Sequence, residues 1–129
     1  MVEINNLTKS KIPKNLLENF IKKIFKKLKI KKDLSIAFVG QKRIKELNKK
    51  YLKREMVTDV LSFPGQNNFL GEIVISLPQA KKQAKKIGHS LKEELKILII
   101  HGLLHLLGFD DKTKKEEKKM QMKEKELLN

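Results

Sequence analysis

Apolar side chains recur at helical spacing in three stretches of the chain, residues 13–28, 41–51 and 77–87. Pro13 suits the first turn of the first stretch, because proline lacks the N–H that a first turn leaves unpaired. Each stretch is predicted to be an amphipathic helix with a lysine-rich outer face. The apolar stripe of the first helix is Leu16, Leu17, Phe20, Ile21, Ile24 and Leu28.

Four shorter runs have the composition and period of β-strands. They are residues 2–6, 34–39, 60–63 and 72–76, with Gly40, Pro64, Gly65 and Gly71 as the turn-type residues beside them. The last two runs are expected to be neighbours in a sheet, joined by a loop too long for a tight hairpin. Strands interleaved with helices on so short a chain predict the α/β or α+β class, a small sheet covered by helices.

The most apolar stretch begins near Ser90 and is predicted to be the central helix. Ser90 and Glu93 have the S-x-x-E spacing of an N-terminal capping box. After Leu95 the helix would be apolar on almost every side, which is typical of a buried helix.

A second capping pair, Thr113 and Glu116, starts a last helix that runs towards Leu127. Its apolar residues are few. We therefore expect it to be the loosest element of the fold, because little apolar area holds it in place.

Two histidines, His101 and His105, lie on the central helix. Four residues of helix separate them by one turn and roughly 6 Å of rise on one face, which suits two ligands of one tetrahedral metal ion. Gly108 can end the helix in the left-handed conformation, and the chain then turns back. A third ligand from Asp110 or Asp111 could therefore reach the same ion. The alternative is a pair of core histidines whose polar atoms are satisfied within the protein.

The chain of 129 residues has no cysteine, so disulfides and thiolate metal sites are excluded. Any metal ligand must be histidine, aspartate or glutamate. The first residues are polar, and no apolar run approaches the length that spans a membrane. We expect one soluble, cytoplasmic domain.

The formal net charge is +15, from 30 basic and 15 acidic residues. Such an excess indicates a polyanionic partner, with nucleic acid as the leading candidate. Only Arg43 and Arg54 are arginines, however, so an AT-rich codon bias or a thermophile surface would explain the lysines as well. The lysine face of residues 13–28 could contact phosphates or could be an ordinary solvated surface.

Three motifs in the expected order resemble those of the YbeY family, the bacterial rRNA maturation factors. They are TDVLSFP at residues 58–64, GEIVIS at residues 71–76 and HGLLHLLGFDD at residues 101–111. The resemblance implies a single α/β (α+β) domain over residues 1–129, with a mixed four-stranded sheet covered by helices and a central, buried metal-binding helix. It further implies a metal-dependent endoribonuclease acting on single-stranded RNA, and we expect the protein to be a monomer. The implied roles are 16S rRNA 3′-end maturation and ribosome quality control, with contact to the small ribosomal subunit.

The chain departs from the family at the third metal ligand, where the family has histidine and this sequence has Asp111. Asp110 matches the family's aspartate. Zinc is the family's usual metal, and aspartate is a sound zinc ligand. We therefore expect His101, His105 and Asp111 to hold Zn²⁺ with an open position for water. A carboxylate lowers the charge of the site by one, which favours a less acidic water and harder metals.

A second departure precedes TDVLSFP. The family often has arginine after tyrosine, whereas Tyr51 is followed here by Leu52. Lys53 and Arg54 lie close enough in sequence to bind the phosphate instead, and we assign them that role.

The histidine spacing also overlaps the metzincin protease signature. A protease of that type needs glutamate after the first histidine as general base, and Gly102 stands there. The protease function is therefore disfavoured. The remaining alternative is a non-catalytic RNA-binding factor in ribosome assembly, with a structural metal or none.

Four further side chains receive minor roles. His89 is expected to be a loop residue outside the metal site, and Asp59 and Ser62 are expected to position their loop near the site. Asp110 or Glu72 could assist as a general base.

Overall fold

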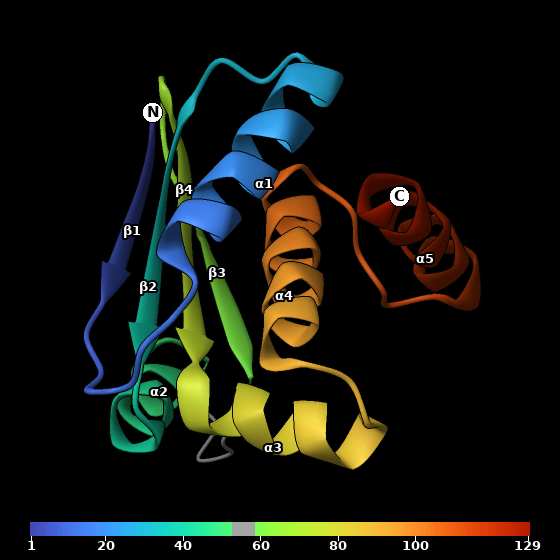
Figure 1. The fold of residues 1–129 in the computed structure, drawn as a ribbon. Coiled ribbons are helices and arrows are strands. Elements are labelled where there is room, and N and C mark those ends of the chain that lie inside the picture. The colour runs from blue at the N-terminus through green and yellow to red at the C-terminus, as the bar shows by residue number, and fades with distance from the viewer. Residues whose placement is uncertain (53–58) are drawn as a thin grey trace.

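The computed structural model describes residues 1–52 and 59–129. These form one four-stranded mixed sheet in the order β1-β2-β4-β3 (Figure 1). Strands β1, β2 and β4 are parallel, and β3 pairs with β4 in the antiparallel direction. The predicted α+β class is confirmed. The strands are β1 (Val2–Asn6), β2 (Asp33–Val39), β3 (Val60–Pro64) and β4 (Phe69–Ser76).

The helices lie at the positions that the sequence predicts, with α1 and α2 between strands and the other three after the last strand, β4. They are α1 (Lys14–Leu28), α2 (Gln41–Leu47), α3 (Leu77–Ile87), α4 (Leu91–Leu106) and α5 (Lys114–Leu128), and α2 continues into the π-helical turn η1 (Asn48–Leu52). None of these helices is both long and apolar enough to cross a membrane.

The connection between β3 and β4 is residues 65–68, which is longer than a two-residue hairpin, as predicted, but shorter than the predicted ends of the two runs imply. Strand β4 begins at Phe69, and the amide of Phe69 donates to the carbonyl of Gln66 at 3.0 Å in a tight turn. The pairing of β3 with β4 continues up to this turn because Gly71, which has no side chain, lets the two strands approach closely. A Cβ atom on Gly71 would lie 2.4 Å from the carbonyl oxygen of Phe63.

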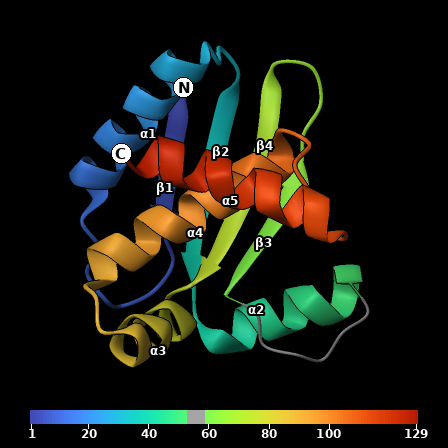
Figure 2. The ribbon, with the colours of Figure 1, turned by 90° about the vertical axis from the view of Figure 1, so that its right-hand side faces the viewer.

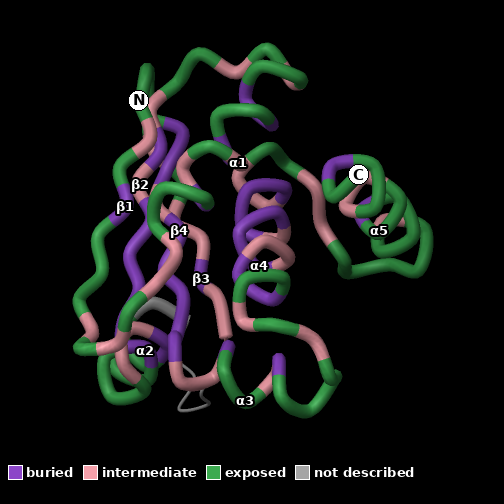
Figure 3. The backbone as a smooth tube through the Cα atoms, in the orientation of Figure 1, coloured by how far each residue is buried: buried purple, intermediate pink, exposed green. Residues whose placement is uncertain are grey.

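Helices α1 and α4 cover one face of the sheet, and α5 lies on the outer side of α4 (Figures 1 and 2). The main core fills the space between this face and the two helices, and α4 is its most deeply buried helix (Figure 3). A smaller cluster on the opposite face packs against α2. It consists of Ala37, Val39, Ile44, Leu61 and Val74.

Helix α4 begins where the capping box predicts, since the Ser90 hydroxyl accepts a hydrogen bond from the Glu93 amide at 3.1 Å. Further along, Gly102 lies directly against the sheet. The Ser62 hydroxyl donates to the Gly102 carbonyl at 3.0 Å, which joins the edge strand β3 to α4. This contact fixes the part of α4 that carries the two histidines.

Candidate metal centre

The end of α4 reverses the chain so that the residues after it return to the histidines. Gly108 has a φ of +98°, which glycine adopts without steric cost. Its amide donates to the carbonyl of His105 at 3.1 Å, and the amide of Phe109 donates to that of Leu104 at 2.9 Å. This is the Schellman arrangement of a helix end. It brings Asp111 back beside the helix, as the position of the glycine predicts.

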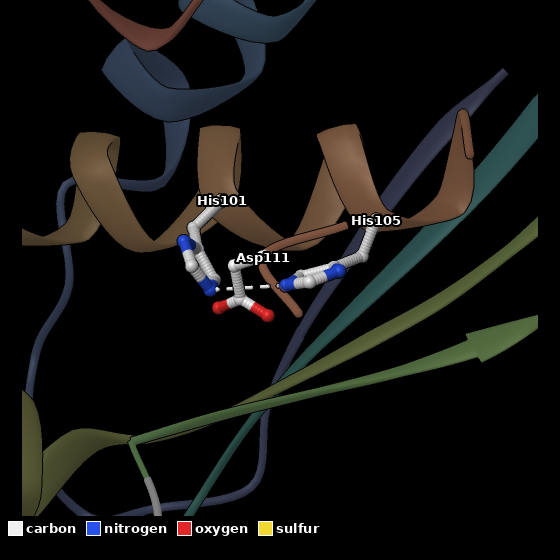
Figure 4. Close-up of side chains that lie close together, drawn as sticks. All are labelled: His101, His105 and Asp111. Atoms are coloured by element: carbon white, nitrogen blue, oxygen red, sulfur yellow. Dashed lines mark hydrogen bonds between the residues drawn. The ribbon is translucent and has the colours of Figure 1, made fainter. Parts of the chain in front are cut away.

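His101, His105 and Asp111 converge on one point (Figure 4). The Nε2 atoms of the two histidines lie 3.2 Å apart, and one ligand atom from each of the three residues lies within 4.8 Å of the others. Both imidazoles are half-buried, whereas Asp111 is exposed. Across residues 1–52 and 59–129, these are the side chains whose ligand atoms come close enough to hold one ion.

The donor set fits a tetrahedral divalent ion. With zinc–nitrogen bonds of about 2.0–2.1 Å, two nitrogens on a tetrahedral ion lie about 3.3 Å apart, which nearly equals the spacing of the two Nε2 atoms. Two imidazole nitrogens and one carboxylate oxygen form a recognised zinc ligand set with room for a fourth, exchangeable ligand. Both histidines are only half-buried, so they differ from the buried core histidines of the alternative.

A hollow of about 310 Å³ lies beside His101, between α4 and α5. Its described lining contains three carboxylates and no lysine or arginine, although the chain as a whole carries a charge of +15. Opposite charge favours a cation locally. The lining residues are His101, Asp111, Glu117, Met120, Gln121 and Glu124.

Glu124 is a site residue that the sequence did not reveal. Its Oε1 lies 3.1 Å from Nδ1 of His101, on the side of the ring away from Nε2. Met120, one helical turn earlier, is buried. Residues four apart share a helix face, so the burial of Met120 was a signal that Glu124 faces α4.

The two carboxylates expected as candidate general bases, Glu72 and Asp110, are outside the three-ligand group. Glu72 accepts a hydrogen bond from the Ser35 hydroxyl at 3.2 Å and, with Arg43, lines a separate hollow of about 490 Å³. Successive side chains of a strand point to opposite faces of the sheet. Ile73 packs against Gly102 on α4, so the neighbouring Glu72 faces away from α4. Glu72 is therefore misplaced for a general base. Asp110 accepts a hydrogen bond from the Asp111 amide at 2.7 Å.

The remaining predicted side chains divide into three cases. Ser62 contacts the backbone of α4, which agrees with a positioning role. His89 lies outside the three-ligand group, and its Nε2 is 2.6 Å from the buried carboxylate of Glu94. Lys53 and Arg54 lie outside the described residues.

The fold and the site together define a small α+β protein with a candidate single-ion centre at the end of its central helix. The comparison with known families narrows this class, because the profile described as Endoribonuclease YbeY matches residues 3–129. The chain belongs to the YbeY family, as its motifs predict.

Three similar proteins illustrate the match. "Endoribonuclease YbeY" of Acholeplasma laidlawii is 39% identical over 131 residues, covering 99% of this chain and 96% of the relative. The protein of the same name from Aquifex aeolicus is 42% identical over 130 residues, covering 95% and 87%. The solution structure of a Thermotoga maritima protein superposes with a TM-score of 0.71 at 30% identity, covering 99% of this chain and 87% of that one.

Proposed function

We propose that this protein is a metal-dependent endoribonuclease that hydrolyses phosphodiester bonds in single-stranded RNA. The convergence of His101, His105 and Asp111 carries the proposal, because these residues offer the ligand set of a hydrolytic zinc site. The names of the relatives support the choice of RNA as substrate.

The chain's own residues have distinct tasks in this proposal. His101 and His105 offer Nε2 lone pairs to the ion, and Asp111 adds a negative charge. A bound divalent ion, zinc in the first instance, supplies a Lewis acid and a more acidic water molecule. Lys53 and Arg54 orient the scissile phosphate.

Lysine-rich surfaces bring the RNA to the centre. Basic side chains bind the phosphate backbone and release its condensed counterions, without reading the base sequence. We further propose that the substrate is the 16S rRNA precursor on the small ribosomal subunit, and that the protein acts as a monomeric single domain in the cytoplasm. The family motifs support this assignment.

Cleavage of a labelled single-stranded RNA oligonucleotide tests the proposal. Protein stripped by a chelator should be inactive and should recover activity with zinc or another divalent ion. His105→Ala should lose both bound metal and cleavage while keeping the circular dichroism of the wild type. Stripped protein that still cleaves RNA would refute the proposed mechanism. Salt-sensitive RNA binding without cleavage under any metal would favour the non-catalytic assembly factor.

A further inference from the structure

We infer that Glu124 is a positioning residue of the metal centre, which holds His101 in the tautomer and orientation that bind the ion. The inference rests on the proposed function, since it requires that the centre holds a metal. It starts from the 3.1 Å contact between Oε1 of Glu124 and Nδ1 of His101. The two side chains come from different helices, 23 residues apart in the chain.

The contact determines which nitrogen of His101 is free. A neutral imidazole has one N–H and one lone pair, and an ionised carboxylate can only accept a hydrogen bond. Glu124 therefore places the proton on Nδ1 and leaves the lone pair on Nε2. That Nε2 is the atom 3.2 Å from Nε2 of His105, on the side where the three ligands converge.

The same contact also affects how strongly His101 binds. A carboxylate that accepts the second N–H of a metal-binding imidazole restrains the ring and raises the basicity of the other nitrogen. Both partners are partly shielded from solvent, with exposed side-chain fractions of 35% for His101 and 22% for Glu124. The hydrogen bond is therefore less weakened by water than one on an open surface.

The fold of α5 aims Glu124 at the histidine. Met120 lies one turn before it and Leu127 one turn after it, and both are buried with exposed fractions of 2% and 5%. Glu124 is thus held on the inner face of α5 between two apolar anchors. Among the ion pairs of the described residues, its partner is His101 rather than one of the many lysines.

Glu117 provides a matched control on the same helix. It lines the same hollow, two turns before Glu124, but its Oε1 accepts a hydrogen bond from the Gln121 side chain at 3.3 Å. Removing Glu117 changes the charge of the hollow by the same amount as removing Glu124. A difference between the two variants therefore reports the contact with His101, not the charge.

The test measures the zinc affinity of Glu124→Ala, Glu124→Gln and Glu117→Ala by competition with a chromogenic chelator. Glu124→Ala should bind zinc about 10–100-fold more weakly than the wild type, the range found when outer partners of metal ligands are removed. Glu124→Gln keeps an oxygen that can accept the Nδ1 proton, so its affinity should lie between those of the wild type and Glu124→Ala. Glu117→Ala should lose less zinc affinity than Glu124→Ala, because it removes the same charge from the hollow without removing a contact to His101.

Two further readouts separate positioning from a structural role. The visible spectrum of the cobalt-substituted protein should change in Glu124→Ala and be largely restored in Glu124→Gln, because the spectrum reports the ligand geometry. The unfolding midpoint of the metal-free protein should be similar for Glu124→Ala and Glu117→Ala.

Three outcomes would overturn the inference. Glu124→Ala that binds zinc like the wild type would refute it alone and leave the proposed function standing. Equal loss of affinity in Glu124→Ala and Glu117→Ala would refute it in favour of a charge effect. A wild type that binds neither zinc nor another divalent ion would refute the proposed function and the inference together.

Discussion

At the scale of single residues, the close approach of α4 to the sheet explains why position 102 is a glycine. A Cβ atom at this position would lie 2.8 Å from Cγ2 of Ile73 and 3.1 Å from the hydroxyl oxygen of Ser62. A larger side chain fits there only if Ile73 or the helix shifts. The close packing therefore also disfavours the glutamate that a metzincin protease needs after the first histidine.

Gly102→Ala is expected to lower the free energy of unfolding by about 1–3 kcal/mol, because the added methyl group overpacks a tight contact. Chemical denaturation of the metal-free protein measures this change. In the double variant Gly102→Ala/Ile73→Ala, the loss should be smaller than the sum of the two single losses, since removing the Ile73 side chain relieves the clash. Additive losses would show that Ile73 does not restrict this site.

The sequence predicts the three proposed ligands because they are local to one another. Helical spacing places His101 beside His105, and the glycine after the helix returns Asp111 to them. Glu124 could not be found in the same way, since its contact depends on the angle at which α5 docks on α4. Periodicity alone does not set that angle.

At the scale of elements, α5 is the helix with the weakest apolar anchoring among those that flank the site. Met120 and Leu127 are its buried residues, whereas α4 has eight, all but Glu94 apolar. Its start is nevertheless well defined, because the Thr113 hydroxyl accepts a hydrogen bond from the Glu116 amide at 3.1 Å. The contact between Glu124 and His101 adds a polar link from α5 to the candidate metal centre.

Amide hydrogen exchange should therefore be slower in α5 when zinc is bound, because the ion orders the histidine to which this helix is linked. The buried residues of α1, such as Leu17 and Ile21, provide the internal control and should exchange at similar rates with and without zinc. Exchange measured by mass spectrometry on peptides from both helices tests this. Equal rates in α5 in the two states would contradict the coupling.

The turn between β3 and β4 shows why some boundaries could not be predicted. Asn67 adopts a φ of 57°, and a hydrogen bond joins Gly65 to Leu70 at 3.0 Å. Gly71 looks like a strand boundary in the sequence. Its missing side chain instead allows the close pairing that extends β4, and this depends on a partner strand that local composition does not specify.

At the scale of the whole molecule, charge and fold contribute separately to function. The formal charge of +15 extends over the lysine-rich helices, while the lining of the metal centre carries carboxylates. An RNA backbone is attracted to the former, and a divalent cation is attracted to the latter.

RNA binding should weaken strongly with salt, with log K falling by about 0.7 per phosphate contact for each unit of log salt concentration. A filter-binding titration with single-stranded RNA between 50 and 200 mM salt would measure the slope. If the protein contacts several phosphates, its RNA affinity should fall about tenfold or more over this range. The slope should be similar for the wild type and His105→Ala, because the lysines bind the phosphates. Binding that does not change with salt would indicate that the lysine excess reflects composition alone.

The class of the fold could be predicted from the sequence. The order of the strands in the sheet could not be predicted from hydrophobic periodicity. The alternation of strands and helices indicates a layered α+β fold, and the family motifs indicate the mixed sheet. The insertion of β2 between β1 and β4 follows from parallel crossovers over long segments. Local patterns do not encode such long-range pairings.

The most direct test of the metal centre is the metal content of untagged protein purified without chelators, measured by elemental mass spectrometry. Wild-type protein should contain close to one zinc ion per chain, Asp111→Ala should lose most of it, and Asp110→Asn should retain it. No metal in the wild type, even after zinc is added back, would contradict the account of His101, His105 and Asp111 as the ligands of a catalytic ion.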